Sequence, residues 1–147
     1  MQEIVYTLLA VMFGALGGIH IPINGALGHR IQSVPVATFT FYGIAFTIIA
    51  TVCLLSWDAK AFAALRTVPP WYYLSGVISV IVVSGNTFLM PRIGAVKVFV
   101  LTFTAQMIVR MFISHFGLLE SPVNPITAAK LVGGGLLVVG AILIVRY

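Results

Sequence analysis

The chain has 147 residues, of which 61% are hydrophobic and only 7% are charged, and its mean hydropathy is +1.13. A soluble fold of this length needs far more charged surface, so the composition excludes a water-soluble protein. The net charge of +5 does not indicate a nucleic-acid partner, because the basic residues stand singly at the ends of apolar segments, and one cysteine, Cys53, excludes a disulfide framework within one chain.

Five apolar segments follow one another, each about long enough to cross the hydrocarbon core of a bilayer. The first is expected to end at Ile21, because Pro22 lacks a backbone donor and favours a kink or a helix end. The longest charged connection is expected between Asp58 and Pro69. The sequence therefore predicts an all-α integral membrane protein, a single transmembrane domain over residues 1–147 with helices at about 4–21, 35–57, 70–90, 95–116 and 126–145.

The basic residues in the connections and near the span ends are almost evenly divided between the two sides of the membrane. One side carries Lys60, Arg66 and Lys130, and the other carries Arg30, Arg92, Lys97 and Arg146. So small a difference permits insertion in both orientations, and hence an antiparallel homodimer that reproduces the inverted repeats of larger transporters. The alternative is a single-topology protein whose loop charges happen to balance.

Three stretches stand out by their order and spacing on the five spans: residues 17–28 (GGIHIPINGALG), 91–95 (PRIGA) and 106–117 (QMIVRMFISHFG). Together they resemble the YdcZ-like five-helix branch of the drug/metabolite transporter (DMT) superfamily, and the resemblance spans nearly the whole chain. It implies a multi-pass protein of the bacterial inner membrane and half of a ten-helix, drug/metabolite-transporter-like dimer, since related exporters contain two five-helix repeats. Family members often carry glutamine where this chain has His20, and an acid where it has Ser114, so a mechanism that uses that acid does not carry over.

Polar side chains inside the spans are the candidates for a substrate pathway, because each is costly in hydrocarbon unless it faces protein or water. His20 and Asn24 are four residues apart. They share a face if the first helix continues past Pro22, and they flank freed backbone carbonyls if it breaks there. The alternative is a helix end at the headgroups, where both side chains simply meet water.

Two further candidates lie in the second and third spans. Tyr42 is well inside the second span, away from the interfaces where the other tyrosines and tryptophans fall. Asn86 follows Gly76 and Ser79 in a stripe of small and polar residues that lines a pathway or, as the favoured alternative, allows close helix contact.

The fourth span gives the sharpest signal. Gln106, Arg110 and Ser114 are spaced one turn apart on one face, and Arg110 lies several residues inside the expected helix end. A guanidinium there cannot lose its charge and needs a counter-charge, carbonyl oxygens or an anionic ligand. The alternative is that Arg110 extends to the same interface as His115.

The absence of a carboxylate within any span disfavours an exporter of cationic drugs and favours the movement of a polar or anionic small molecule. If transport is coupled to protons, His20 and His115 are the candidate proton-binding groups, since histidine is the side chain that ordinarily titrates near neutrality. The expected function is therefore a small-molecule membrane transporter, an exporter that works as an antiparallel homodimer. The alternative is a non-transporting membrane scaffold or assembly subunit.

Small residues at four-residue spacing favour close packing of helices, either within the chain or in the dimer. Gly14 and Gly18 have this spacing in the first span, and in the last span Gly133 has it with Ala129 and is followed by Gly140. No enzyme, metal-binding, cofactor-binding or nucleic-acid-binding signature is recognised, so the expected partners are a small-molecule solute, the lipid bilayer and a second copy of the chain.

Overall fold

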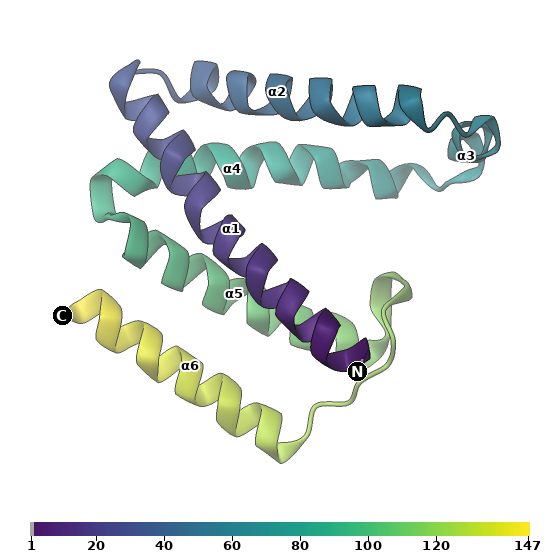
Figure 1. Cartoon of the computed structure of the whole chain (residues 1–147). Coiled ribbons are helices and arrows are strands. Elements are labelled where there is room, and N and C mark those ends of the chain that lie inside the picture. The colour runs from purple at the N-terminus through teal and green to yellow at the C-terminus, as the bar shows by residue number, and fades with distance from the viewer. Residues whose placement is uncertain (1) are drawn as a thin grey trace. The chain divides into compact units, whose positions relative to one another are not determined.

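The computed structural model describes residues 2–147, and the regular structure in that range is helical (Figure 1). The helices are α1 (Gln2–Arg30), α2 (Val34–Leu55), α3 (Ala59–Ala64), α4 (Leu74–Ile93), α5 (Ala95–Phe116) and α6 (Ala128–Arg146), with the 3-10 turns η1 (Leu65–Thr67), η2 (Pro70–Tyr73) and η3 (Leu118–Glu120). Within the described residues, α1, α2, η2 with α4, α5 and α6 are long and apolar enough to cross a membrane. The predicted all-α, five-span architecture is therefore confirmed.

The predicted end of the first helix at Ile21 is wrong, because α1 continues through Pro22 to Arg30. A proline inside a helix removes one hydrogen bond and costs about 3 kcal/mol in water. The turns that follow Pro22 contain Asn24, Gly25 and Gly28, which are buried in the described structure. Their packing offsets the cost of the proline, so the tertiary contact decides where this helix ends.

Other parts of the predicted helix layout also differ from the structure. α4 continues through Pro91 to Ile93, so that Gly94, whose φ is +89°, forms the turn before α5 in place of residues 91–94. Glycine tolerates this φ because it has no Cβ. The charged connection after α2 contains α3, whose first turn is capped by the Asp58 side chain accepting from the backbone N–H groups of Lys60 and Ala61. α6 begins at Ala128, after the N-cap Thr127, and not at residue 126.

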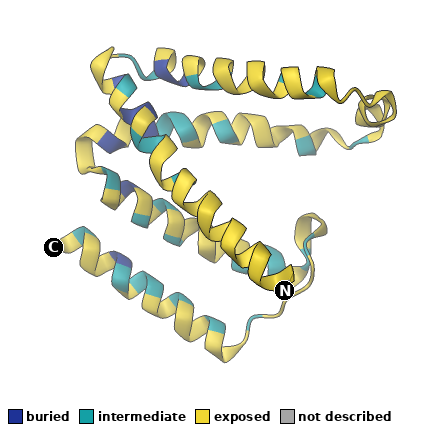
Figure 2. Cartoon of the chain, in the orientation of Figure 1, coloured by how far each residue is buried: buried dark blue, intermediate teal, exposed yellow. Residues whose placement is uncertain are grey.

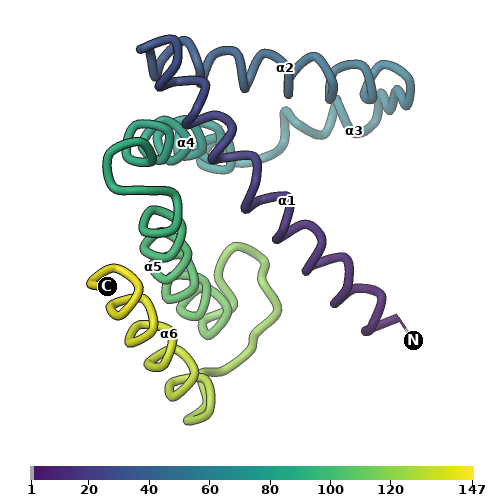
Figure 3. The backbone as a smooth tube through the Cα atoms, turned by 60° about the vertical axis from the view of Figure 1, so that its left-hand side comes forward, coloured from purple at the N-terminus to yellow at the C-terminus, as the bar shows by residue number. Residues whose placement is uncertain are grey.

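The chain divides into two compact units, Met1–Arg92 and Ile93–Tyr147. In the first unit α2 and α4 lie side by side, and the C-terminal part of α1 crosses the end of α4 (Figures 1 and 3). In the second unit α5 and α6 lie side by side and run in opposite directions (Figures 1 and 3). The expectation of a single five-helix domain stays a prediction.

Buried residues of the first unit gather where the end of α1 meets the start of α2 and the end of α4 (Figure 2). Ala37 and Met90 are the apolar members of this cluster, and the polar ones are Asn24, Thr38, Asn86 and Thr87. The core of this unit is therefore built largely from small and polar side chains, which pack closely only where hydrogen bonds satisfy them.

Large apolar side chains are exposed along all five long helices, with Phe39 at 78% and Leu55 at 85%. In water this would be a severe aggregation liability. In a bilayer it is the surface that contacts lipid, and the backbone of each helix satisfies its own hydrogen bonds there.

Candidate functional site: a cationic cavity between α5 and α6

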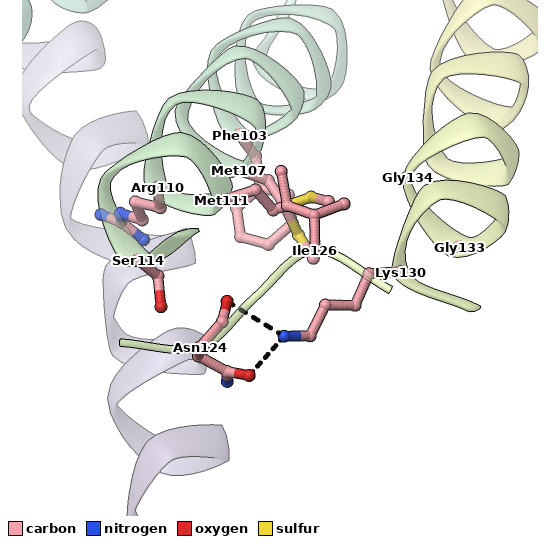
Figure 4. Close-up of a pocket in the computed structure, with 10 residues that line it drawn as sticks. All are labelled: Phe103, Met107, Arg110, Met111, Ser114, Asn124, Ile126, Lys130, Gly133 and Gly134. Carbon is pink, nitrogen blue, oxygen red and sulfur yellow. Dashed lines mark hydrogen bonds between the residues drawn. The ribbon is translucent and has the colours of Figure 1, made fainter. Parts of the chain in front are cut away.

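The second unit contains a cavity of about 360 Å³ between α5, α6 and the connection that joins them (Figure 4). Its lining consists of Phe103, Met107, Arg110, Met111, Ser114, Asn124, Ile126, Lys130, Gly133 and Gly134. The α5 members recur every three or four residues, and so do the α6 members, which places each set on one helix face. The volume lies at the lower end of the range typical of small-molecule pockets, about 300–1,000 Å³.

Arg110 lies in the lining without a carboxylate partner among residues 2–147. One of its terminal nitrogens, Nη2, donates a long hydrogen bond of 3.4 Å to Oε1 of Gln106, one turn earlier on α5. Because a guanidinium has five N–H donors, most of its hydrogen-bonding capacity is available to a ligand. Gln106 itself does not line the cavity and acts on it only through this contact.

Lys130 is the second cation of the lining and is held quite differently. Its ammonium donates to the Asn124 side-chain oxygen, to the Asn124 carbonyl at 3.3 Å and to the Pro125 carbonyl at 2.7 Å (Figure 4 shows the bonds to Asn124). An ammonium has three N–H groups, so all of them are used by neutral acceptors. Lys130 therefore fixes the connection and leaves its charge uncompensated at the cavity.

The connection between α5 and α6 is also bonded to the last turn of α5. The backbone N–H of Asn124 donates to the Ser114 carbonyl at 2.8 Å, and the Ser114 hydroxyl donates to the Pro122 carbonyl at 3.4 Å. The backbone N–H of Ile126 donates to Nδ1 of His115 at 3.0 Å. Ser114 and His115 thus position the loop that forms one wall of the cavity.

In the first unit, Asn24 joins α1 to α4. Its Nδ2 donates to Oγ1 of Thr87 at 2.7 Å, and the two residues are 4% and 1% exposed. The α1 backbone comes close at this point, since a Cβ on Gly28 would lie 3.0 Å from the Thr87 methyl group. Asn24 therefore acts as a helix-to-helix contact within the unit.

Hydroxyl groups join α2 to α4 in the same way. The Tyr42 hydroxyl bonds to the Ser79 hydroxyl, and the Ser84 hydroxyl donates to Thr38 Oγ1 at 3.3 Å. His20 stacks on the Phe41 ring, with the ring centroids 5.7 Å apart. These contacts hold the helices of the first unit against one another.

Asn86 belongs to the buried polar cluster of the first unit and is only 5% exposed. Its expected place in a substrate pathway stays a prediction.

The structure thus groups the predicted site residues in two sets. Arg110 and Ser114 share the cavity of the second unit, with Gln106 and His115 beside them. The remaining candidates, His20, Asn24, Tyr42 and Asn86, lie at helix contacts of the first unit.

The four glycines expected at close helix contacts have open space beside them within the described residues. A Cβ at Gly14, Gly18, Gly133 or Gly140 would meet no atom within 4 Å, while Gly133 lines the cavity. The close approaches occur instead at Gly25 and Gly28, which the four-residue glycine pattern did not single out. A role of the four glycines in dimer packing stays a prediction.

Sequence reasoning also missed Lys130 and Asn124 as members of the site. The sequence analysis counts Lys130 only among the basic residues near the span ends, because it lies in the first turn of the last helix. The signal that could have found the pair is its spacing, because Asn124 lies six residues before Lys130, within reach of a long lysine side chain that turns back along the chain.

Residues 5–143 match the model of a family described as "Putative inner membrane exporter, YdcZ". Neither the curated proteins nor the solved structures contain a match to this chain.

Proposed function

The chain belongs to the YdcZ family of inner-membrane exporters, and from this premise we propose that it exports a small anionic or polar metabolite as an antiparallel homodimer. Membership of the family makes the chain a multi-pass inner-membrane transporter. The class of solute and the antiparallel dimer are our proposals.

One observation carries the proposed solute class: the ionisable side chains that line the cavity, Arg110 and Lys130, are both cationic. An anion entering the cavity would be attracted by both. A cation would meet two like charges. Asp58 and Glu120 lie in the connections and Glu3 in the first turn of α1, so none of them is placed within the middle of a span to bind a cationic drug.

The assembly is proposed from span number and charge. One chain supplies five membrane-spanning helices among its described residues, half of the ten that two-repeat exporters contain. Three basic residues on one side of the membrane against four on the other permit both insertions, and two oppositely inserted copies would supply inverted repeats.

An experiment on solute class uses proteoliposomes loaded with benzenesulfonate, which stays ionised at every working pH, or with benzyltrimethylammonium, a cation of similar size. We expect the purified chain to release the anion faster than the cation. Arg110→Gln should reduce anion release to the rate of liposomes without protein. The matched control is Arg66→Gln, which removes the same charge from η1, outside the cavity. Faster release of the cation, or unchanged anion release in Arg110→Gln, would refute the proposed solute class.

The antiparallel arrangement is tested separately by the sidedness of single cysteines. The native Cys53 is first replaced by alanine, and a cysteine is placed at Ala63 in the connection after α2. A membrane-impermeant maleimide should label about half of the molecules in intact cells and all of them after permeabilisation. Labelling of all or of none in intact cells would establish a single orientation and contradict the antiparallel dimer.

The scaffold alternative makes a different prediction for the cavity. A non-transporting subunit needs no water-accessible site, so single cysteines at Met107 and Met111 should resist the impermeant maleimide in that case. Modification of both, blocked by benzenesulfonate, is expected for the transporter.

A further inference from the structure

Arg110 and Lys130 differ in how they can bind a ligand, because only Arg110 has N–H donors that are not already used in hydrogen bonds within the chain. All three N–H groups of Lys130 are taken by Asn124 and Pro125, whereas Arg110 uses one nitrogen in a long bond to Gln106. Figure 4 shows the guanidinium of Arg110 directed away from α6 and from the ammonium of Lys130, so that it lies at the edge of the cavity. A bound acidic group would therefore hydrogen-bond to Arg110, while the positive charge of Lys130 attracts it without a direct hydrogen bond.

Most of the remaining wall is apolar. Phe103, Met107, Met111 and Ile126 line the cavity, and Ser114 and Asn124 supply the neutral polar groups. Methionine side chains adapt to ligands of varied shape, and they offer favourable contacts to an aromatic ring. A strongly polar anion would leave this wall unused and would lose its own hydration without compensation.

Space for an apolar group is left on the α6 side. A Cβ on Gly133 would meet no atom within 4 Å, although Gly133 lines the cavity. At Gly134 a Cβ would already lie 3.7 Å from the Met111 sulfur, in ordinary contact. Gly133 is thus the position at which a side chain can enter the cavity without disturbing the contact between α5 and α6.

We infer that the cavity of the second unit selects small organic anions with an apolar body, the acidic group binding Arg110 and the body lying in the space beside Gly133. This inference rests on the proposed function and narrows its solute class from polar or anionic to amphipathic. The cavity of about 360 Å³ suits a body of one or two rings and is too small for a phospholipid with two acyl chains.

The first measurement is thermal stabilisation of the full chain in vesicles of zwitterionic phosphatidylcholine. The probes are 1-naphthalenesulfonate, methanesulfonate, which lacks the apolar body, and 1-naphthalenemethanol, which lacks the charge. A ligand that binds only the folded chain raises its midpoint of unfolding. We expect 1-naphthalenesulfonate to stabilise the chain at a concentration at least about tenfold below that needed for either other probe, because burial of the rings and the charged hydrogen bond add together.

Two variants of α6 locate the bound body. Gly133→Leu should fill the cavity and abolish stabilisation by 1-naphthalenesulfonate. Gly135→Leu is the matched control, since Gly135 has the same open surroundings on the same helix but does not line the cavity. Both variants gain the same helix propensity, so their unfolding midpoints without probe should change alike. Retained binding in Gly133→Leu, or equal loss in both variants, would overturn the inference.

The acidic group is located with Arg110→Gln. We expect the affinity for 1-naphthalenesulfonate to fall about ten- to hundredfold, as the loss of a charge-assisted hydrogen bond predicts, and the weak affinity for 1-naphthalenemethanol to stay the same. Equal loss for both probes would mean that the substitution disturbed the cavity as a whole and would overturn the assignment.

An anionic lipid also combines an acidic group with apolar chains. The measurement is therefore repeated in vesicles that contain phosphatidylglycerol. Unchanged binding of 1-naphthalenesulfonate supports a free organic anion, and its loss there would overturn the inference in favour of an anionic lipid. Release from proteoliposomes distinguishes failure of this inference from failure of the proposed function. If methanesulfonate is released as fast as 1-naphthalenesulfonate, only the amphipathic solute class is refuted. If 1-naphthalenesulfonate binds but no anion is released, only the transport proposal is refuted.

Discussion

Nδ1 of His115 accepts a hydrogen bond of 3.0 Å from the backbone N–H of Ile126, eleven residues further along the chain. A ring nitrogen accepts only when it carries no proton, so this bond requires the histidine to be neutral with its proton on Nε2. Ile126 lines the cavity between α5 and α6. The protonation state of one histidine is thereby linked to the position of one cavity wall.

The first prediction concerns this link. Protonation of Nδ1 removes the acceptor and places a positive charge against the Ile126 N–H, so acid should release the connection. Amide hydrogen exchange of the peptide 117–127, corrected for the intrinsic effect of pH, should therefore be faster at acidic pH than at neutral pH. In His115→Asn, whose side-chain oxygen accepts at any pH, the corrected rate should not depend on pH.

A corrected exchange rate in wild type that is independent of pH would show that His115 does not control the loop.

The second prediction concerns the buried bond from Asn24 to Thr87. Thr87→Val keeps the shape and removes the acceptor, which leaves a buried amide donor and should cost about 1–3 kcal/mol of unfolding free energy. Replacing both partners, in Asn24→Leu with Thr87→Val, should recover part of that loss because no buried polar group remains. Reversible unfolding in mixed detergent micelles measures the cycle, and additive effects of the two substitutions would contradict a direct bond.

The third prediction concerns the close approach of α1 at Gly28. A Cβ there would lie 3.0 Å from the Thr87 methyl group and 3.5 Å from the Ala37 Cβ, so Gly28→Ala should destabilise the chain by about 1–3 kcal/mol. Gly43→Ala is the control on α2, where a Cβ meets nothing within 4 Å and the helix should gain about 0.5–1 kcal/mol. Thermal unfolding in the same detergent distinguishes them, and equal midpoints would contradict the packing described.

The fourth prediction concerns the charge of the cavity. Ser114→Asp introduces a carboxylate into the lining that contains Arg110. The new ion pair should occupy the guanidinium, so that release of benzenesulfonate falls about tenfold or more while release of benzyltrimethylammonium rises. Ser114→Asn keeps the size without the charge and should leave the preference for the anion in place; a reversal in both variants would show that charge is not the cause.

Much of the architecture follows from the sequence alone. The five spans are set by the cost of burying charged groups and exposed backbone in hydrocarbon, a property that each segment has by itself. The same reasoning identified Arg110 as an unpaired charge, and the structure places it in a cavity without a carboxylate partner in the described chain. The motifs at residues 17–28, 91–95 and 106–117 indicated the family that the comparison then matched.

Tertiary contacts decided the rest. Local rules end α1 at Pro22, but the packing of Asn24, Gly25 and Gly28 against the other helices of the first unit extends the helix to Arg30. A lysine in the first helical turn is typical of an interfacial anchor, yet Lys130 turns back to the carbonyls of Asn124 and Pro125 and becomes part of the cavity. Spacing along a helix shows which residues share a face. Which neighbour that face meets depends on segments distant in sequence, and only the folded chain brings them together.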